Sequence, residues 1–162
     1  MRLTHRPVAE QDLAAICAFT QSAAELFYCL PKADFPLTPE QLQAAIEQRS
    51  DSTVVLLEGA VVAFANFYRW ETGGVCALGN VMVAPAVRGR GVARYLIEQM
   101  LGTAFTRHQA CEVQVSCFNP NVAGLLLYPQ LGFLPCGVEE RAGKGGERLA
   151  LIHFRLASPA CR

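Results

Sequence analysis

The sequence has few charged residues and no excess of either sign. Only 17% of its 162 residues are charged, and 14 basic side chains balance 14 acidic ones. Nucleic-acid binding over a broad face needs clustered positive charge, so we expect no nucleic-acid partner. The apolar fraction of 52% is too high for long disordered segments. We expect one domain spanning residues 1–162.

Two further absences limit the class of protein. The chain contains no uninterrupted run of about twenty apolar residues, so we expect no membrane partner. Its first segment, MRLTHRPVAEQDL, lacks the apolar core of a secretory signal. We therefore expect a cytoplasmic protein.

The seven cysteines form no C-x-x-C pair, and their number is odd. This spacing does not support a zinc site, so we expect no metal. In a reducing compartment we expect free thiols, most of them buried as small apolar side chains. The cysteines are Cys17, Cys29, Cys76, Cys111, Cys117, Cys136 and Cys161.

Apolar periodicity predicts a mixed α/β chain. Helical patterns and alternating strand patterns follow one another along the whole sequence, which favours a sheet flanked by helices. A proline at position 129 predicts that the last helix ends or kinks near Tyr128. We expect strands over 3–8, 52–70 (two strands meeting near Glu58–Gly59), 75–83, 111–118, 131–140 and 147–157, and helices over 9–27, 38–49, 91–107 and 121–128.

The segment VAPAVRGRGVARYL, residues 83–96, places a glycine-rich turn between a strand and an amphipathic helix. The first amides of a helix lack partners within it and carry partial positive charge, so they attract phosphate. Gly89 and Gly91 allow close approach of a ligand to the backbone. Arg88 and Arg90 add positive charge. The turn therefore indicates a phosphate or pyrophosphate ligand.

Two common nucleotide motifs are absent from this turn. A dinucleotide fingerprint, G-x-G-x-x-G, would need a third glycine where Arg94 stands. The Walker motif G-x-x-x-x-G-K-[ST] does not occur either. A nucleotide-binding protein that uses the same turn differently remains a competing hypothesis, and it would prefer ATP or NAD to other ligands.

Arg88, Gly91 and Ala93 resemble the Q/R-x-x-G-x-G/A signature of the GNAT superfamily of N-acetyltransferases. A second similarity lies downstream in NVAGLLLYPQLGF. There the family has an asparagine, a tyrosine seven residues later and then L-G-F. These places are held by Asn121, Tyr128, Leu131, Gly132 and Phe133. The resemblance extends over about residues 3–156.

The resemblance implies a single-domain GNAT-like fold. Its mixed, mostly antiparallel sheet would have about seven strands and about four flanking helices, with the fourth and fifth strands splayed apart. It also implies acetyl-CoA as co-substrate. The pyrophosphate would bind the backbone of Arg88, Gly89, Arg90, Gly91, Val92 and Ala93, while Val81, Met82 and Val83 would offer an edge to the pantetheine, which Asn121 would also contact.

The implied reaction is direct attack of a primary amine on the thioester in a ternary complex. The amide of Met82 or Val83 would polarise the thioester carbonyl. Tyr128 would protonate the leaving thiolate as a general acid. No general base is identified, because Glu71, Glu112 and His108 qualify only by residue type.

The acceptor is the least determined partner. It would be a small-molecule amine or a protein amine, held near Phe27, Tyr28, Phe35 and the loop around Lys144. The same aromatic residues could instead belong to the core. A catalytically inactive CoA-binding sensor or partner module is the alternative function. The resemblance also allows a homodimer, which no feature of the sequence specifies.

Overall fold

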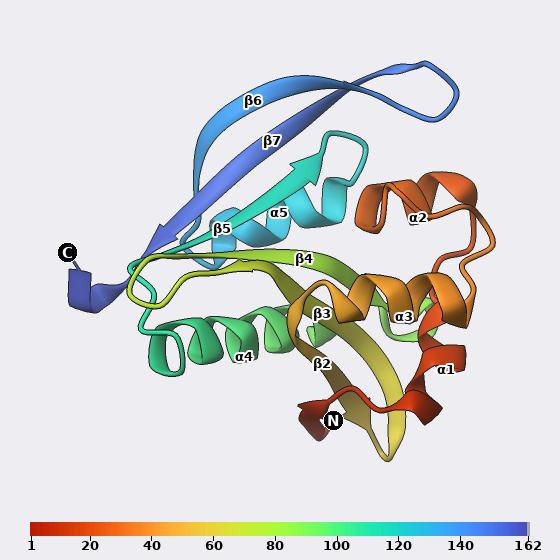
Figure 1. Ribbon diagram of the computed structural model, residues 1–162, viewed down its shortest axis with the longest axis horizontal. Coiled ribbons are helices and arrows are strands. Elements are labelled where there is room, and N and C mark those ends of the chain that lie inside the picture. The colour runs from red at the N-terminus through yellow and green to blue at the C-terminus, as the bar shows by residue number, and fades with distance from the viewer. Residues whose placement is uncertain (162) are drawn as a thin grey trace.

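The protein forms a seven-stranded sheet in the order β1-β2-β3-β4-β5-β7-β6 (Figure 1). The computed structural model describes residues 1–161. Neighbouring strands are antiparallel except β4 and β5, which are parallel. This confirms the expected mixed, mostly antiparallel sheet. The strands are β1 (Leu3–Pro7), β2 (Ser50–Leu57), β3 (Ala60–Trp70), β4 (Val75–Val83), β5 (Glu112–Phe118), β6 (Leu134–Ala142) and β7 (Arg148–Ala157).

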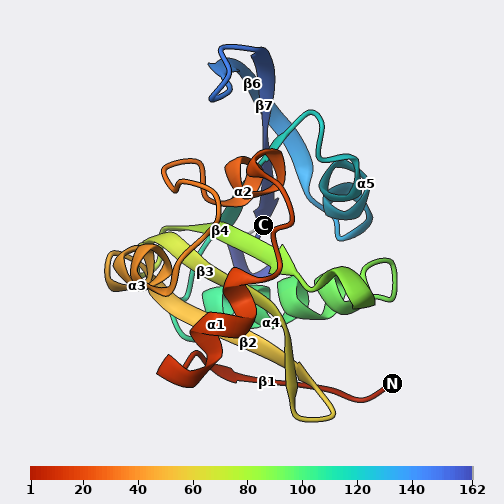
Figure 2. The same cartoon turned by 90° about the vertical axis from the view of Figure 1, so that its right-hand side faces the viewer.

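Helices cover both faces of the sheet (Figure 2). One face carries α1 (Leu13–Cys17), α2 (Ala23–Cys29) and α3 (Pro39–Glu47), and the other carries α4 (Val92–Thr106) and α5 (Val122–Gln130). Short 3-10 turns lie at Glu10–Asp12, Pro85–Val87 and Pro159–Cys161. Within residues 1–161, none of these helices is long and apolar enough to cross a membrane.

Each face of the sheet has its own apolar core. Ile16, Leu42, Phe64 and Met82 belong to the cluster beneath α1, α2 and α3. The stripe of α4 predicted from its periodicity packs on the other face, where Leu96, Ile97, Met100 and Ala104 are at most 1% exposed. The central strands are thus packed between two helix layers, and the candidate site lies at their ends.

The first predicted helix, over 9–27, is wrong as a continuous element. The chain makes α1, leaves helical conformation near Thr20, and starts again as α2 after Ser22. The Ser22 side chain accepts a hydrogen bond from the Glu25 amide at 3.1 Å, so it begins a new helix instead of continuing the first. By contrast, α3 begins as predicted, with Thr38 accepting from the Gln41 amide.

The helix expected to end or kink near Tyr128 continues for two further residues. The helix passes through Pro129 and ends at Gln130. A proline in the last turn of a helix removes only one backbone donor, its own N–H. The Tyr128 carbonyl still accepts hydrogen bonds from the amides of Leu131 and Phe133. Tyr128 therefore lies inside the helix rather than at its end.

The prediction of free thiols is wrong for two of the seven cysteines. Cys111 before β5 and Cys161 near the C-terminus are joined by a disulfide, with their Cα atoms 5.5 Å apart. Fifty residues separate them in the sequence, so their spacing gave no indication of the pair. Among the free cysteines, Cys76 and Cys117 are buried as expected, while Cys136 is exposed.

Candidate active site between the splayed strands

The parallel strands β4 and β5 pair over only half of their length. Their register runs from Val75 opposite Glu112 to Leu78 opposite Val115, and no pairing between them follows. The second half of β4 therefore has an unpaired edge toward β5. This gap beside Val81 and Val83 is the splay that the resemblance implied.

A bulge in β4 begins where this pairing ends. Phe64 of β3 faces Met82, but Asn66, two residues on, faces Gly79, so β4 holds one extra residue. Asn80 lies in this bulge, and its φ of 50° is in the left-handed region. Its buried side chain donates to the Cys29 carbonyl at 2.8 Å and accepts from Asn66 Nδ2 at 3.0 Å. These bonds stabilise the bent conformation of β4 and tie it to α2.

The backbone of Val83 faces the gap. Ala84 donates its amide to Val62 of β3, so by the two-residue alternation of a strand Met82 also directs its amide to β3. The Val83 carbonyl instead accepts from Arg88 Nε at 3.1 Å, away from the β3 ladder. The N–H and C=O of one strand residue point to the same side. Of the two predicted oxyanion donors, Val83 therefore has the suitable orientation and Met82 does not.

The N-terminus of α4 lies beyond the end of β4 and presents unpartnered amides. The first helical hydrogen bond runs from the Tyr95 amide to the Gly91 carbonyl, and no side chain caps the helix. In the described part of the chain, no backbone amide from Gly89 to Arg94 donates a hydrogen bond. Such a helix end is a favourable site for an anion.

Gly89 and Gly91 have the conformation that this turn requires. Their φ angles are 75° and 83°, where a Cβ is disfavoured. A Cβ placed on either glycine would have no neighbouring atom within 4 Å. The space outside both residues is therefore open to a ligand.

The two arginines of the turn differ in what they contact. The Arg88 guanidinium donates to the Phe19 carbonyl and to Glu25, each at 2.9 Å, which links the turn to the segment around α2. The Arg88 guanidinium therefore already has partners within the protein, whereas the Arg88 backbone remains part of the turn. Arg90 is exposed and makes no hydrogen bond among residues 1–161.

Across the gap, α5 brings Asn121 and Tyr128 against Cys117 of β5. The Asn121 side chain caps α5 by accepting from the Gly124 amide at 3.2 Å. A Cβ on Gly124 would lie 2.8 Å from Cys117 Sγ and 3.3 Å from the Tyr128 ring. Only glycine at position 124 allows α5 to approach β5 this closely.

Tyr128 is only 4% exposed and packs against Phe133 and Phe154, with ring centroids 5.7 Å and 5.8 Å away. Burial, with a smaller contribution from the Cys117 thiol, raises the pKa of Tyr128 well above its ordinary value of about 10. Its hydroxyl makes no hydrogen bond within residues 1–161. Tyr128 therefore holds its proton throughout the neutral range.

A model of the acetyltransferase (GNAT) family matches residues 17–133, which include the split strands, the glycine turn and all of α5. The chain belongs to the GNAT family of acetyltransferases.

Solved structures of acetyltransferases share the fold. A ribosomal-protein-alanine N-acetyltransferase from Brucella melitensis is 24% identical, with a TM-score of 0.77 over 96% of this chain and 99% of that one. A Salmonella typhimurium structure assigned as an acetyltransferase, with its cofactor acetyl-CoA, is 21% identical, with a TM-score of 0.75 over 97% and 94%. A structure assigned as a phosphinothricin N-acetyltransferase is 24% identical, with a TM-score of 0.77 over 96% and 98%.

The residues present in this GNAT chain fit acetyl-CoA. Unpartnered amides at the start of α4 suit a pyrophosphate, and the open space beside Gly89 and Gly91 admits it. The unpaired edge of β4 suits an extended arm with its own amide groups. Within residues 1–161 no cluster of three metal-ligating side chains occurs.

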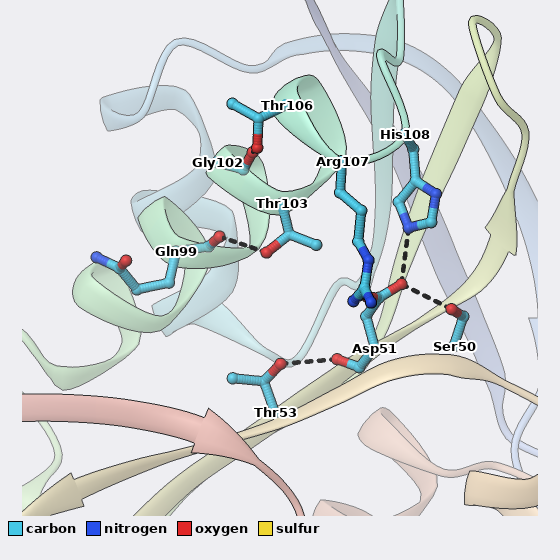
Figure 3. A network of polar contacts seen from close by, with 9 residues as sticks. All are labelled: Ser50, Asp51, Thr53, Gln99, Gly102, Thr103, Thr106, Arg107 and His108. Atoms are coloured by element: carbon cyan, nitrogen blue, oxygen red, sulfur yellow. Dashed lines mark hydrogen bonds and ion pairs between the residues drawn. The ribbon is translucent and has the colours of Figure 1, made fainter.

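The acidic and basic residues considered earlier as bases lie away from this gap. His108 follows α4, whose fifteen residues separate it from Gly91 by about 22 Å. Its Nε2 lies 2.7 Å from Asp51, which also contacts Ser50 and Arg107 in the polar network of Figure 3. Glu71 pairs with Arg69 beside the β3–β4 turn. Glu112 starts β5 and accepts from Gln114 at 2.6 Å.

The aromatic residues predicted for the acceptor side separate into two groups. Phe27 and Tyr28 of α2 pack on Phe118 at the end of β5, with ring centroids 5.1 Å and 6.1 Å away. Phe35 lies in the loop after α2 and is 45% exposed. Lys144, in the β6–β7 turn, donates to the Ala33 carbonyl at 2.6 Å and contacts Asp34. The hairpin therefore reaches the loop after α2.

Sequence reasoning missed two polar groups near the gap. One is the Asn66–Asn80 pair, which the bulge buries. The other joins Ser116, His153 and Glu139 across three strands. Their only sequence signal is a polar residue at alternate strand positions, which is equally typical of a solvated sheet face.

Proposed function

We propose that the protein transfers an acetyl group from acetyl-CoA to a primary amine by direct attack in a ternary complex. The observation that carries this proposal is the alignment of three features along one path. They are the open amides at the start of α4, the unpaired edge of β4, and Tyr128 beyond the gap. When bound, acetyl-CoA supplies the activated acetyl group.

Backbone groups do most of the binding in this account. Amides from Gly89 to Ala93 hold the pyrophosphate, aided by the positive end of the α4 dipole. The amides of Val81 and Val83 are available to the arm in the gap, and Val83 can stabilise negative charge on the thioester oxygen. Asn121 lies on the opposite side of the same gap.

Tyr128 is the general acid in this proposal. Because its pKa is raised, it remains protonated at neutral pH and can donate to a departing thiolate. Its ring is held by Phe133 and Phe154, so the hydroxyl has a fixed direction. The neighbouring Cys117 thiol also stays protonated, since burial raises its pKa to about 11.

The experiment that tests this function compares ligands and then turnover. Thermal unfolding is measured with acetyl-CoA, CoA, ATP and NAD, and CoA release is then followed with a panel of primary amines. We expect stabilisation by the two CoA compounds and amine-dependent CoA release. Stabilisation by ATP or NAD in their place would contradict the proposal, and tight CoA binding without turnover of any amine would favour an inactive CoA-binding module.

A further inference from the structure

Three polar side chains form a continuous hydrogen-bonded row across β5, β7 and β6, which lie side by side in Figure 1. Ser116 Oγ lies 2.6 Å from His153 Nδ1, and His153 Nε2 lies 3.0 Å from Glu139 Oε1. Ser116 and His153 are direct cross-strand partners. Gly137 stands opposite His153 on β6, so no side chain there separates the ring from Glu139.

The charge on Glu139 determines which nitrogen of His153 carries the hydrogen. Arg141, 3.0 Å away, and to a lesser extent His153 hold the pKa of Glu139 below its ordinary value. A carboxylate can only accept, so His153 Nε2 donates to it. In the neutral ring Nδ1 then has a free lone pair and accepts from the Ser116 hydroxyl. The lone pairs of Ser116 Oγ remain available to a further donor.

The row begins at the mouth of the gap between β4 and β5. Ser116 is the first residue of β5 after the last paired position, Leu78 opposite Val115. Its neighbour Cys117 packs toward Tyr128, so Ser116 points to the opposite face of the sheet. A reacting group in the gap would therefore have Tyr128 on one side and Ser116 on the other.

The face that carries Ser116 is the face of α2. Phe118 and Leu151, the next cross-strand pair on this face, belong to one apolar cluster against which Phe27 packs. The Ser116–His153 pair comes directly after them. His153 is 35% exposed, so its ring also reaches solvent. An amine approaching this face beside Phe118 would meet the Ser116 hydroxyl.

We propose that Ser116 and His153 together accept the proton of the attacking amine, while Glu139 positions the imidazole. This inference rests on the proposed acetyl transfer. The ammonium N–H bond breaks as its proton passes to Ser116 Oγ, and the Ser116 proton passes to His153 Nδ1. The nitrogen lone pair that remains makes the new bond to the thioester carbon, the C–S bond breaks, and the departing sulfur takes the Tyr128 proton. The nitrogen then loses its second proton to solvent, from which Tyr128 recovers its own. His153 becomes an imidazolium between Ser116 and the Glu139 carboxylate, and it returns its proton to solvent.

Other titratable groups lie around the row. Glu139 and Arg141 face it from β6, Arg155 lies two residues away on the same face of β7, and Glu112 lies on the same face of β5. Arg49, just before β2, places its guanidinium against Gly79 of β4, where a Cβ would collide with it. From α2, Tyr28 contacts the neighbouring Phe118.

The first test needs no acceptor. We would measure imidazole ¹⁵N and ¹H NMR of the protein alone and assign His153 with His153→Gln. The expected result is a hydrogen on Nε2, a bare Nδ1, and a changed Nδ1 signal in Ser116→Ala. A hydrogen on Nδ1, or signals that neither Ser116→Ala nor Glu139→Gln alters, would overturn the proposal.

The second test is the pH dependence of amine acetylation, with phosphinothricin and a peptide beginning with alanine as probe acceptors. Ser116→Ala and His153→Gln should lower kcat/KM about 100-fold at pH 7, a typical loss for a general base. The deficit should shrink as pH rises toward the pKa of the amine, because free amine needs no base. Ser116→Thr, which keeps the hydroxyl, should restore most of the activity.

Matched controls separate this role from a structural one. Glu139→Gln should alter the pH profile, whereas Glu140→Gln, which removes the neighbouring ion pair with Arg148, should not. All variants should keep the stabilisation by acetyl-CoA. Wild-type pH profiles in Ser116→Ala and His153→Gln, or an acetyl group found on Ser116 itself, would overturn the proposal.

The outcomes distinguish this proposal from the proposed function. A wild-type protein that neither binds acetyl-CoA nor acetylates an amine contradicts the function. Normal transfer by the Ser116 and His153 variants contradicts the proton route alone. If acetyl-CoA binds but neither probe is acetylated, the NMR test decides on the proton route. A hydrogen on His153 Nε2 with an Nδ1 signal that depends on Ser116 supports the route, and a hydrogen on Nδ1 contradicts it.

Discussion

Replacing Gly91 by glutamate should abolish acetyl-CoA binding without unfolding the protein. The added carboxylate would enter the open space at the start of α4, where the pyrophosphate is proposed to lie. Two unit charges about 4 Å apart repel by about 4 kcal/mol at an effective dielectric constant near 20. That energy corresponds to about a thousandfold weaker binding.

The chain offers a matched control at Gly59, in the turn between β2 and β3. Its φ of 83° equals that of Gly91, and a Cβ there would also have no neighbour within 4 Å. Both substitutions place a side chain in the left-handed region, so each should cost about 1–2 kcal/mol of stability. Gly91→Glu and Gly59→Glu should therefore melt a few degrees lower than wild type by similar amounts.

The assay is thermal unfolding with and without acetyl-CoA at about a hundred times the wild-type dissociation constant. Ligand at that level adds about 2.7 kcal/mol, which raises the melting temperature by several degrees in a chain of this size. The shift should persist in Gly59→Glu and vanish in Gly91→Glu. An equal shift in both variants, or its loss in both, would refute the assignment of the pyrophosphate to this turn.

Three other substitutions test separate parts of the account. Tyr128→Phe should lower kcat by about 100-fold or more while acetyl-CoA still stabilises the protein, and an unchanged kcat would exclude the general acid. The pKa of Tyr128 is raised in the folded protein. The wild-type free energy of unfolding, measured in urea, should therefore be independent of Tyr128 ionisation below about pH 10 and decrease above it. Tyr128→Phe should reduce this decrease. Gly124→Ala should lose about 1–3 kcal/mol by overpacking against Cys117, as chemical denaturation would show. Burial raises the pKa of Asp51, but the hydrogen bonds from Ser50, His108 and Arg107 and the attraction to His108 together lower it. The stabilisation by Asp51 should therefore be present above about pH 4 and decrease at lower pH, and Asp51→Asn should flatten this dependence in urea.

The sequence predicted the parts of the fold that depend on local pattern. The amphipathic pattern of α4, the start of α3 at Thr38 and the glycine turn each depend on residues within one short segment. The broken first helix shows the limit of this reasoning. Residues 9–27 have helical composition throughout, but the Ser22 hydroxyl competes for the Glu25 amide and starts a second helix.

The candidate site was predictable only where a motif marks it. Asn121, Tyr128 and the turn at Gly89–Gly91 were assigned to the site in this way, and their roles stay predictions. The Ser116–His153 pair and the Cys111–Cys161 disulfide join residues 37 and 50 positions apart. The pairing of β5 with β7 brings the first pair together, and the two cysteines lie just outside the same paired strands. Likewise, the choice of Val83 over Met82 depends on which amides β3 already uses.

The most direct measurement of the central claim is product analysis with isotopically labelled acetyl-CoA. Purified protein would be incubated with acetyl-CoA carrying a labelled acetyl group and with a panel of primary amines, and all products would be identified by mass spectrometry. The account predicts a labelled amide and one molecule of free CoA for each amide formed. Labelled acetate without amide, label on the protein itself, or bound acetyl-CoA that no amine consumes would contradict it.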